Sequence, residues 1–298
     1  MVSTPVSSAN KKAQDGQKMR WRTVLFAIVL LGVLSALAVT GMRNATAPED
    51  KAFLTHLEFV AGNAFVVANP AHDIVLSTMT RVTDDPEYLS LPLRIWPRGT
   101  DITVTDWANG IPEIRYFPST GHLELPHLSE SRLSRVLAEF GERRTEKKAT
   151  EALLRGLGTR VEVTAVVEFA RPMTSVADGG GRVLLSPARV GKFPLYWDGE
   201  PCADSEGCED LSPAERFRRW VDGLREEDRG TLDAFGLELA ELRKAAREGK
   251  VYGEIVEGVT PVELEKLLKD PGIRSVRVAE VGLRCASSLS TECLPVPV

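Results

Sequence analysis

Six carboxylates fall within thirteen residues of one short stretch, YWDGEPCADSEGCEDLSP, at residues 196–213. Hard oxygen ligands packed this closely can bind Ca²⁺, and extracellular calcium sites tolerate weak affinity. The spacing is not that of a helix–loop–helix calcium loop. We therefore predict no metal and no cofactor, and interpret the stretch as a solvated acidic loop or an exposed surface for a basic partner, with Ca²⁺ as the alternative. The six residues are Asp198, Glu200, Asp204, Glu206, Glu209 and Asp210.

The four cysteines, Cys202, Cys208, Cys285 and Cys293, form two close pairs with five and seven residues between partners. An even number of cysteines in local pairs is typical of disulfides in an oxidising compartment. Three connectivities are possible, and proximity favours Cys202–Cys208 with Cys285–Cys293. A four-cysteine zinc site is the alternative, but it usually needs only two to four residues between paired ligands.

No familiar catalytic signature is present in the body of the chain: G-x-S-x-G, HExxH and Walker A patterns are absent. His72 and Asp73 are adjacent and could form an acid–base pair, but neighbours on a strand point to opposite faces. We interpret them as a surface histidine beside a turn aspartate. His122 and His127 share a loop and could bind a metal, although ordinary loop polarity explains them equally well. We assign no catalytic residue.

Twenty uncharged and mostly apolar residues run from Thr23 to Met42. A helix of that length covers roughly 30 Å, the thickness of a bilayer's hydrocarbon core. Trp21 stands at its boundary, where an indole ring suits the headgroup level, and the basic residues concentrate before the segment. This pattern predicts a single transmembrane helix at 23–42, with the N-terminus in the cytoplasm and the body of the chain outside.

The alternative interpretation of the segment is a cleaved secretory signal. The run from Val24 to Leu34 has the length of a signal's apolar core, and Ala36-Leu37-Ala38 is a small-x-small triplet that would allow cleavage after Ala38. The apolar character continues to Met42, which favours a retained anchor. Both interpretations export the rest of the chain.

The charge distribution argues against nucleic-acid partners. Five basic residues and one acidic residue give residues 1–22 a net charge of +4, and since the whole chain carries −5, residues 23–298 carry −9. So acidic a body is poorly suited to a phosphate backbone or an anionic lipid surface. At 43% hydrophobic and 27% charged residues, the composition is that of a globular protein.

The fold class predicted from these patterns is α+β, an exported mixed domain that follows the membrane helix. We expect a disordered basic cytoplasmic tail (1–22), the membrane helix (23–42), a linker (43–52), a β-rich region (53–128), an amphipathic helical connector (129–157) and an α+β region (158–298). The strand-like runs of the β-rich region are LEFVAGNAFVVAN, YLSLPLRIW, TDITVTDW and PEIRYF. Pro92, inside one run, predicts an edge strand.

The connector predicts either one long helix or two helices broken near Gly141. In the α+β region, VEVTAVVEF alternates with apolar residues on one face and Glu162, Thr164 and Glu168 on the other. Ser-Pro-Ala-Glu at 212–215 predicts a capped helix start, followed by helices over 213–228 and 231–248. A second capping sequence at 260–263 sits inside a strand–helix–strand unit, which predicts a parallel crossover or a split βαβ unit.

The composition of RVLAEFGERR (135–144) and RFRRWVDGLREEDRG (216–230), with the apolar segment RWRTVLFAIVLLGVLSALAVTG (20–41), resembles that of uncharacterised actinomycete single-pass membrane proteins. The resemblance covers the layout of the whole chain and implies an exported domain on one membrane helix. The layout is also similar to that of transmembrane anti-sigma regulators. The cytoplasmic tail of about 20 residues, however, is far shorter than a folded sigma-binding domain.

The function predicted from these observations is that of a membrane-anchored envelope protein. Its acidic extracytoplasmic domain would bind another envelope protein or a cell-wall component without catalysis. One alternative is an exported hydrolase with an unfamiliar carboxylate or histidine site. Convergence of His72, Asp73 or the acids of 198–210 in one concave pocket would favour it. The other is a secreted protein released after Ala38.

Overall fold

The structure, a computed structural model, describes residues 48–76, 81–82, 87–99, 111–142, 147–158, 160–174, 182–198 and 211–283. The predicted membrane segment, the run TDITVTDW, all four cysteines and the acidic loop beyond Asp198 lie outside these residues. Within the described ranges, no helix combines the length and the apolar character that a membrane crossing requires. The chain divides into two units, Met1–Leu54 and Thr55–Val298, and the fold described below is that of the second.

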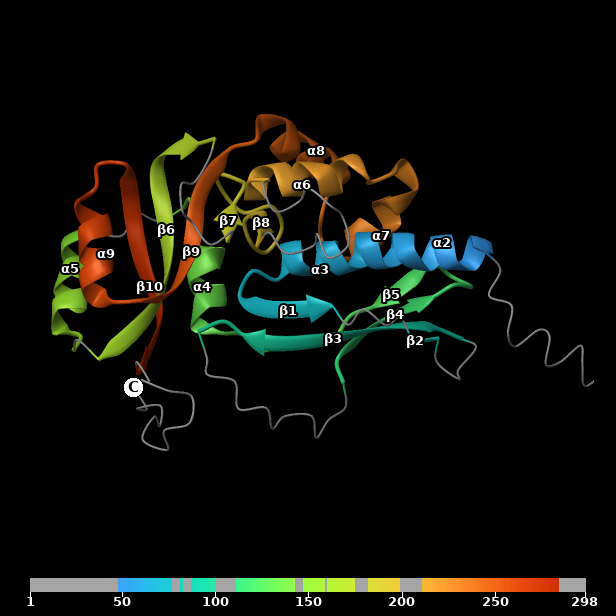
Figure 1. Cartoon of the computed structure of the whole chain (residues 1–298), viewed down its shortest axis with the longest axis horizontal. Coiled ribbons are helices and arrows are strands. Elements are labelled where there is room, and N and C mark those ends of the chain that lie inside the picture. The colour runs from blue at the N-terminus through green and yellow to red at the C-terminus, as the bar shows by residue number, and fades with distance from the viewer. Residues whose placement is uncertain are drawn as a thin grey trace, which may run out of the picture. The chain divides into compact units, whose positions relative to one another are not determined.

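The fold is α+β, as predicted, and the described residues form two antiparallel sheets of five strands (Figure 1). The first sheet has the order β1-β3-β4-β5, with β2 also paired to β3, and the second has the order β10-β6-β9-β7-β8. The strands of the first are β1 (His72–Leu76), β2 (Arg81–Val82), β3 (Leu89–Pro97), β4 (Glu113–Phe117) and β5 (His122–Glu124); those of the second are β6 (Val161–Met173), β7 (Val183–Leu184), β8 (Tyr196–Trp197), β9 (Val251–Val259) and β10 (Ile273–Leu283).

The predicted strand–helix–strand unit is β9, α9 (Pro261–Lys269) and β10. Both strands pair antiparallel with β6, which lies between them, so they run parallel to each other. This is the split βαβ arrangement. The predicted cap is present: Thr260 Oγ1 accepts from the Glu263 amide at 3.3 Å, and Glu263 Oε2 accepts from the Thr260 amide at 2.8 Å.

The predicted cap at 212–215 is followed by four helical elements. They are α6 (Pro213–Asp222), η3 (Glu226–Asp228), α7 (Arg229–Ala234) and α8 (Leu239–Glu248). Ser212 and Glu215 form its reciprocal hydrogen bonds. The helix predicted over 231–248 is instead two helices, because Gly236 adopts a φ of 68° and the Leu237 amide turns back to the Leu232 carbonyl at 3.1 Å. The inner face of α6 places Trp220 against Trp197 of β8, with ring centroids 5.5 Å apart.

The strand predicted for LEFVAGNAFVVAN is wrong, because the run is helical. It covers the end of α2 (Pro48–Leu57), the π-helical turn η1 (Glu58–Gly62) and α3 (Asn63–Ala68). Val60, Ala64 and Val67 join one buried apolar cluster, while Ala61 and Phe65 join the other. Residues three and four apart therefore share a face, as they do on a helix. A short apolar run buried on all sides carries no periodicity that separates helix from strand.

The edge strand predicted from Pro92 is also wrong, since β3 has neighbours on both sides. The Leu93 amide donates to the Pro112 carbonyl on the β4 side at 2.7 Å, so the nitrogen of Pro92 faces the other way. On that side, among the described residues, β1 pairs from Leu93 onward and β2 pairs with Leu89 and Ser90. The N–H that proline lacks is therefore not needed, because Pro92 lies between the residues that pair with β1 and those that pair with β2.

Strand β6 alternates as predicted, but both of its faces are buried. Val163, Ala165 and Val167 join one apolar cluster, and Val166 joins the other. Glu168, predicted on a polar face, is buried and accepts from Arg274 at 2.7 Å and from Ser275 at 3.0 Å. A central strand between two layers needs such partners for any polar side chain it carries.

The helical connector is two helices, α4 (Arg132–Ala138) and α5 (Lys147–Gly156), which confirms the alternative with a break near Gly141. Gly141 adopts a φ of 78°, and its Cα approaches the chain at Pro187 so closely that an added Cβ would overlap the carbonyl oxygen there. Only glycine satisfies both constraints.

We therefore expect Gly141→Ala to destabilise the fold more than Gly121→Ala. Gly121 has a similar φ of 68° but nothing within 4 Å of an added Cβ, so it isolates the cost of the left-handed backbone, about 1–2 kcal/mol. Overlap with Pro187 should add about 1–3 kcal/mol at Gly141. Denaturant unfolding of both variants measures the difference, and equal losses would contradict the close approach.

Candidate functional site

Arg98 is the most deeply buried charged side chain in the described residues, with 0% of it exposed. It follows β3 in a turn whose geometry is held by the residues just before β1. Its amide donates to the Ala71 carbonyl at 3.0 Å, and its side-chain Nε donates to the Pro70 carbonyl at 3.0 Å. These bonds fix the guanidinium in position before any charged partner is counted.

Three carboxylates from separate elements surround this guanidinium. Asp73 of β1 lies 2.5 Å from Nη1, Glu257 of β9 lies 3.3 Å from Nη1, and Asp198, just after β8, lies 3.2 Å from Nη2. Arg182 adds a second cation, 3.0 Å from Glu257 and 3.8 Å from Asp73. We call these five residues, Asp73, Arg98, Arg182, Asp198 and Glu257, the Arg98 network.

An aromatic ring completes the surroundings of Arg98: its guanidinium carbon lies 5.1 Å from the centroid of Tyr196. Burial raises the pKa of Tyr196 well above its ordinary value, so the phenol stays neutral. Burial also raises the pKa of Glu257, while Arg98 and Arg182 oppose the rise. The carboxylates of the network are thus engaged by cations, an arrangement that favours structure over proton transfer.

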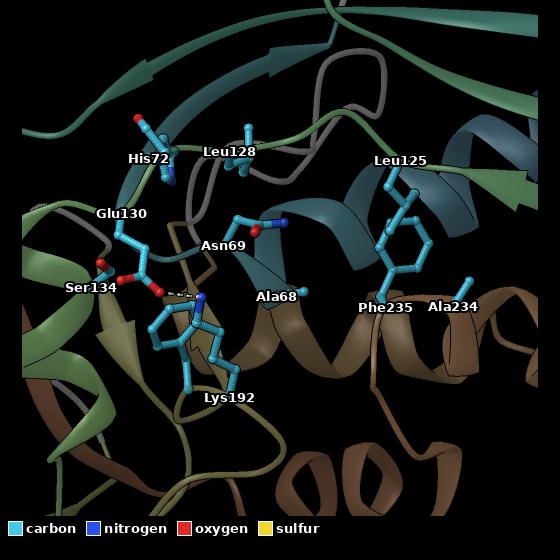
Figure 2. A pocket seen from close by; sticks show the side chains of 12 residues that line it. Ala68, Asn69, His72, Leu125, Leu128, Glu130, Ser134, Lys192, Ala234 and Phe235 are labelled. Atoms are coloured by element: carbon cyan, nitrogen blue, oxygen red, sulfur yellow. Dashed lines mark hydrogen bonds and ion pairs between the residues drawn. The ribbon is translucent and has the colours of Figure 1, made fainter.

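A pocket of about 190 Å³ lies beside the network. Its walls come from the end of α3, from β1, from the segment 125–130, from Lys192 and Phe193, and from α7 (Figure 2). Figure 2 shows His72, Glu130 and Lys192 on one side of the pocket, and Leu125, Ala234 and Phe235 on the other. The pocket therefore has a polar end and an apolar end.

His72 is a buried polar group of this pocket, with only 6% of its surface exposed. Burial lowers its pKa, and the positive charges of Arg98 and Lys192 lower it further. A hydrogen bond to the backbone of Ser129 acts in the opposite direction, so the ring must donate to the carbonyl oxygen. Among the described residues, its Nε2 has no hydrogen-bond partner. This nitrogen is therefore unbonded and is itself closed to solvent.

Four other polar side chains of the pocket are already bonded. Lys192 Nζ lies 3.2 Å from Glu130 Oε1, and both side chains are mostly exposed, at 64% and 70%. The Asn69 amide donates to the Phe65 carbonyl at 2.8 Å. Ser134 Oγ donates to the Ser131 carbonyl at 2.7 Å.

Neither a model of a known protein family, nor a curated protein sequence, nor a solved structure matches the chain. The function has to be argued from the site itself.

The residues predicted as candidates lie in different places. Of the acidic loop, the structure describes only Asp198, which pairs with Arg98. His122 is exposed on β5 and stacks on Phe117, with centroids 6.1 Å apart, and His127 is exposed. In the ranges that the structure describes, no three His, Cys, Asp or Glu side chains are grouped so as to hold a metal ion.

The interpretation of His72 as a surface histidine and of Asp73 as a turn residue is wrong, because both belong to β1. The alternation on which we relied is nevertheless present: His72 lines the pocket while Asp73 pairs with Arg98. Asp73 and Asp198 do converge, but around a buried arginine and not in the pocket. The convergence that would have favoured a hydrolase is therefore used for ion pairing.

Sequence reasoning missed Arg98, Arg182 and Glu257 entirely, and also Glu130 and Lys192. The one local signal was Pro97-Arg98-Gly99, which reads as a turn. A turn residue is usually solvated, so nothing in the sequence marks this arginine as buried.

We expect Arg98→Met to cost about 3–5 kcal/mol of stability near pH 7, because it leaves three carboxylates without their main cation. Arg115→Met is the matched control: Arg115 also pairs with two glutamates but is 41% exposed, so its loss should cost under about 1 kcal/mol.

The loss at Arg98 should shrink as the pH falls. Without the cation, burial raises the folded-state pKa of Glu257 further above its unfolded value, and its ionised form destabilises the fold. Protonation at acidic pH removes that penalty. Denaturant unfolding at pH 7 and near pH 4.5 measures both effects; a pH-independent loss would contradict the network as the cause.

Proposed function

We propose that the chain is a single-pass membrane protein of the cell envelope, with its N-terminus in the cytoplasm. Its C-terminal domain lies outside and binds a partner protein without catalysing a reaction. The observation that carries the proposal is the pocket beside the Arg98 network, which is small, open to solvent at a charged rim, and lined by side chains that already have hydrogen-bond or ionic partners.

The membrane anchor is supported by the sequence alone. Residues 23–42 carry no charge and are long enough to cross a bilayer, and the basic residues before them favour a cytoplasmic N-terminus. The acidic body that follows favours partners with basic or neutral surfaces over nucleic acid.

The alternative of a hydrolase receives less support from the site. Carboxylate catalysis needs acid and base groups that are free to exchange protons with a substrate. Asp73, Asp198 and Glu257 are engaged by arginines, and Glu130 is paired with Lys192. Ser134, one of two serines that line the pocket, donates its hydroxyl to the Ser131 carbonyl of its own helix cap. A binding role does not require any of these groups to exchange a proton.

The anchor is tested by fractionation of the native membranes. We expect a full-length chain that resists alkaline extraction, with an intact mass that includes residues 1–38. A soluble species that begins near Val39 would refute the anchor and favour a secreted protein.

The binding role is tested by photo-cross-linking in intact cells. A photoreactive residue at His127, exposed beside the pocket, should capture one protein, whereas the same residue at Val262, 55% exposed on α9, should not. Lys192→Glu reverses the charge at the rim and should reduce capture at least about tenfold. Lys244→Glu, at a comparably exposed lysine, should leave it unchanged. Capture that is equal at both positions, or insensitive to Lys192, would refute binding at this face.

A further inference from the structure

We infer that a second copy of this chain packs on the outer face of the first sheet, so that two copies form a symmetric dimer. The outer face is the side of β1, β3, β4 and β5 that points away from the buried apolar cluster of Leu91, Leu93 and Ile114. Helix α3 lies on the inner side of β1 (Figure 1). The outer face takes no part in the pocket, so the inference goes beyond the proposed function.

One end of the outer face is apolar around a single cation. Val75 of β1, 42% exposed, is paired with the exposed Arg94 of β3. The register of β3 with β4 pairs Pro92 with Glu113, and its continuation brings Ile111, 50% exposed, beside Arg94. The solvated face of an antiparallel sheet usually carries polar residues. Exposed aliphatic side chains gathered around a cation are therefore typical of a contact surface.

The other end of the outer face is aromatic beside a carboxylate. The ring of Phe117 on β4 lies 5.7 Å from that of Tyr88, which precedes β3, measured between centroids. Glu124 of β5 is 56% exposed, and its contact with Arg115 is long, at 3.5 Å. Arg115 is closer to Glu113, at 2.7 Å. Negative charge is therefore left over at the Glu124 end.

The two ends complement each other. Arg94 is exposed and, in the part of the chain that the structure describes, no carboxylate pairs with it. Apart from His122, the charged side chains that β3, β4 and β5 carry are Arg94, Arg115, Glu113 and Glu124, which are equal in number by sign. A second copy related by a twofold axis can exchange the ends, so that Arg94 meets Glu124 and the aliphatic side chains meet the rings. Twofold symmetry forms each of these contacts twice.

The same distribution of charge disfavours other occupants of the face. A partner of one charge sign would be attracted at one end and repelled at the other, and an anionic bilayer surface fails for that reason. A second copy supplies both signs, each where the opposite sign is needed. Two antiparallel sheets also pack readily face to face.

A photoreactive residue at Ile111 tests the contact in intact cells. We expect a covalent product with twice the mass of the chain. The same residue at Leu153, 51% exposed on α5, should give no such product. A product with a different protein, or no product at Ile111, would overturn the second copy as the occupant.

Exchange of the two charges tests the pairing itself. Arg94→Glu sets two carboxylates against each other in the dimer, and Glu124→Arg sets two cations against each other, so either variant alone should reduce the cross-linked dimer at least about tenfold. Co-expression of the two variants with different tags should restore a mixed dimer, because every contact again joins opposite charges. Restoration also shows that both variants fold. Arg171→Glu, at an exposed arginine of β6, should leave the dimer unchanged.

Either of two results of the charge exchange would overturn the inference. The first is a dimer that withstands Arg94→Glu or Glu124→Arg alone. The second is a failure of the co-expressed variants to form the mixed dimer.

The purified full chain in detergent micelles gives a second measurement. Native mass spectrometry should show a dimer that Ile111→Glu dissociates, because the substitution places an unpaired charge at the apolar end. Val262→Glu, at a comparably exposed aliphatic residue, should leave the dimer intact. A dimer insensitive to Ile111→Glu would overturn the inference. Partner capture at residue 127 is measured separately, so the dimer and the proposed binding role can fail independently.

Discussion

The structure of the second unit depends on a buried arginine whose partners come from both sheets. Asp73 belongs to the first sheet, Glu257 belongs to the second, and Asp198 follows β8 of the second. A guanidinium with no solvent exposure is stable only if its charge and its donors are matched, and this one has three carboxylates, one backbone carbonyl and an aromatic face. Because each partner is contributed by a different segment, the two sheets cannot separate without exposing unpaired charge.

The turn that carries Arg98 is fitted to this position by its neighbour. Gly99 has a φ of 73°, and an added Cβ would lie 2.5 Å from Thr164 Oγ1 and 3.3 Å from Glu280 Cβ. The turn after β3 therefore lies directly against β6 and β10, with no room for a side chain. Strand β1 contributes one residue to the Arg98 network and one to the pocket. Its alternation points Asp73 at the arginine and His72 into the pocket, so the network that joins the sheets also orients the pocket's buried acceptor.

The sequence was informative wherever the controlling interactions are local. The caps at Ser212 and Thr260, the break at Gly141 and the alternation of β6 each depend on residues within a few positions, and each was predictable. The sequence was uninformative where the structure of a segment depends on how deeply it is buried in the fold. The run at 57–69 is helical because it lies between two apolar clusters, and Arg98 meets partners 100 and 159 residues away in the chain. Only the assembled fold reveals that a turn arginine is buried or that His72 faces a pocket.

The distribution of charges between the network and the pocket argues for recognition more than for chemistry. An active site keeps at least one acid or base poised to change protonation, which requires a group that is neither neutralised nor locked. Here the partly buried carboxylates are paired with arginines, and burial together with two nearby cations lowers the pKa of the imidazole. At the rim, Lys192 and Glu130 are already paired, and Asn69 and Ser134 are already hydrogen-bonded. A partner that bound at this face would therefore lose little entropy to ordering these side chains.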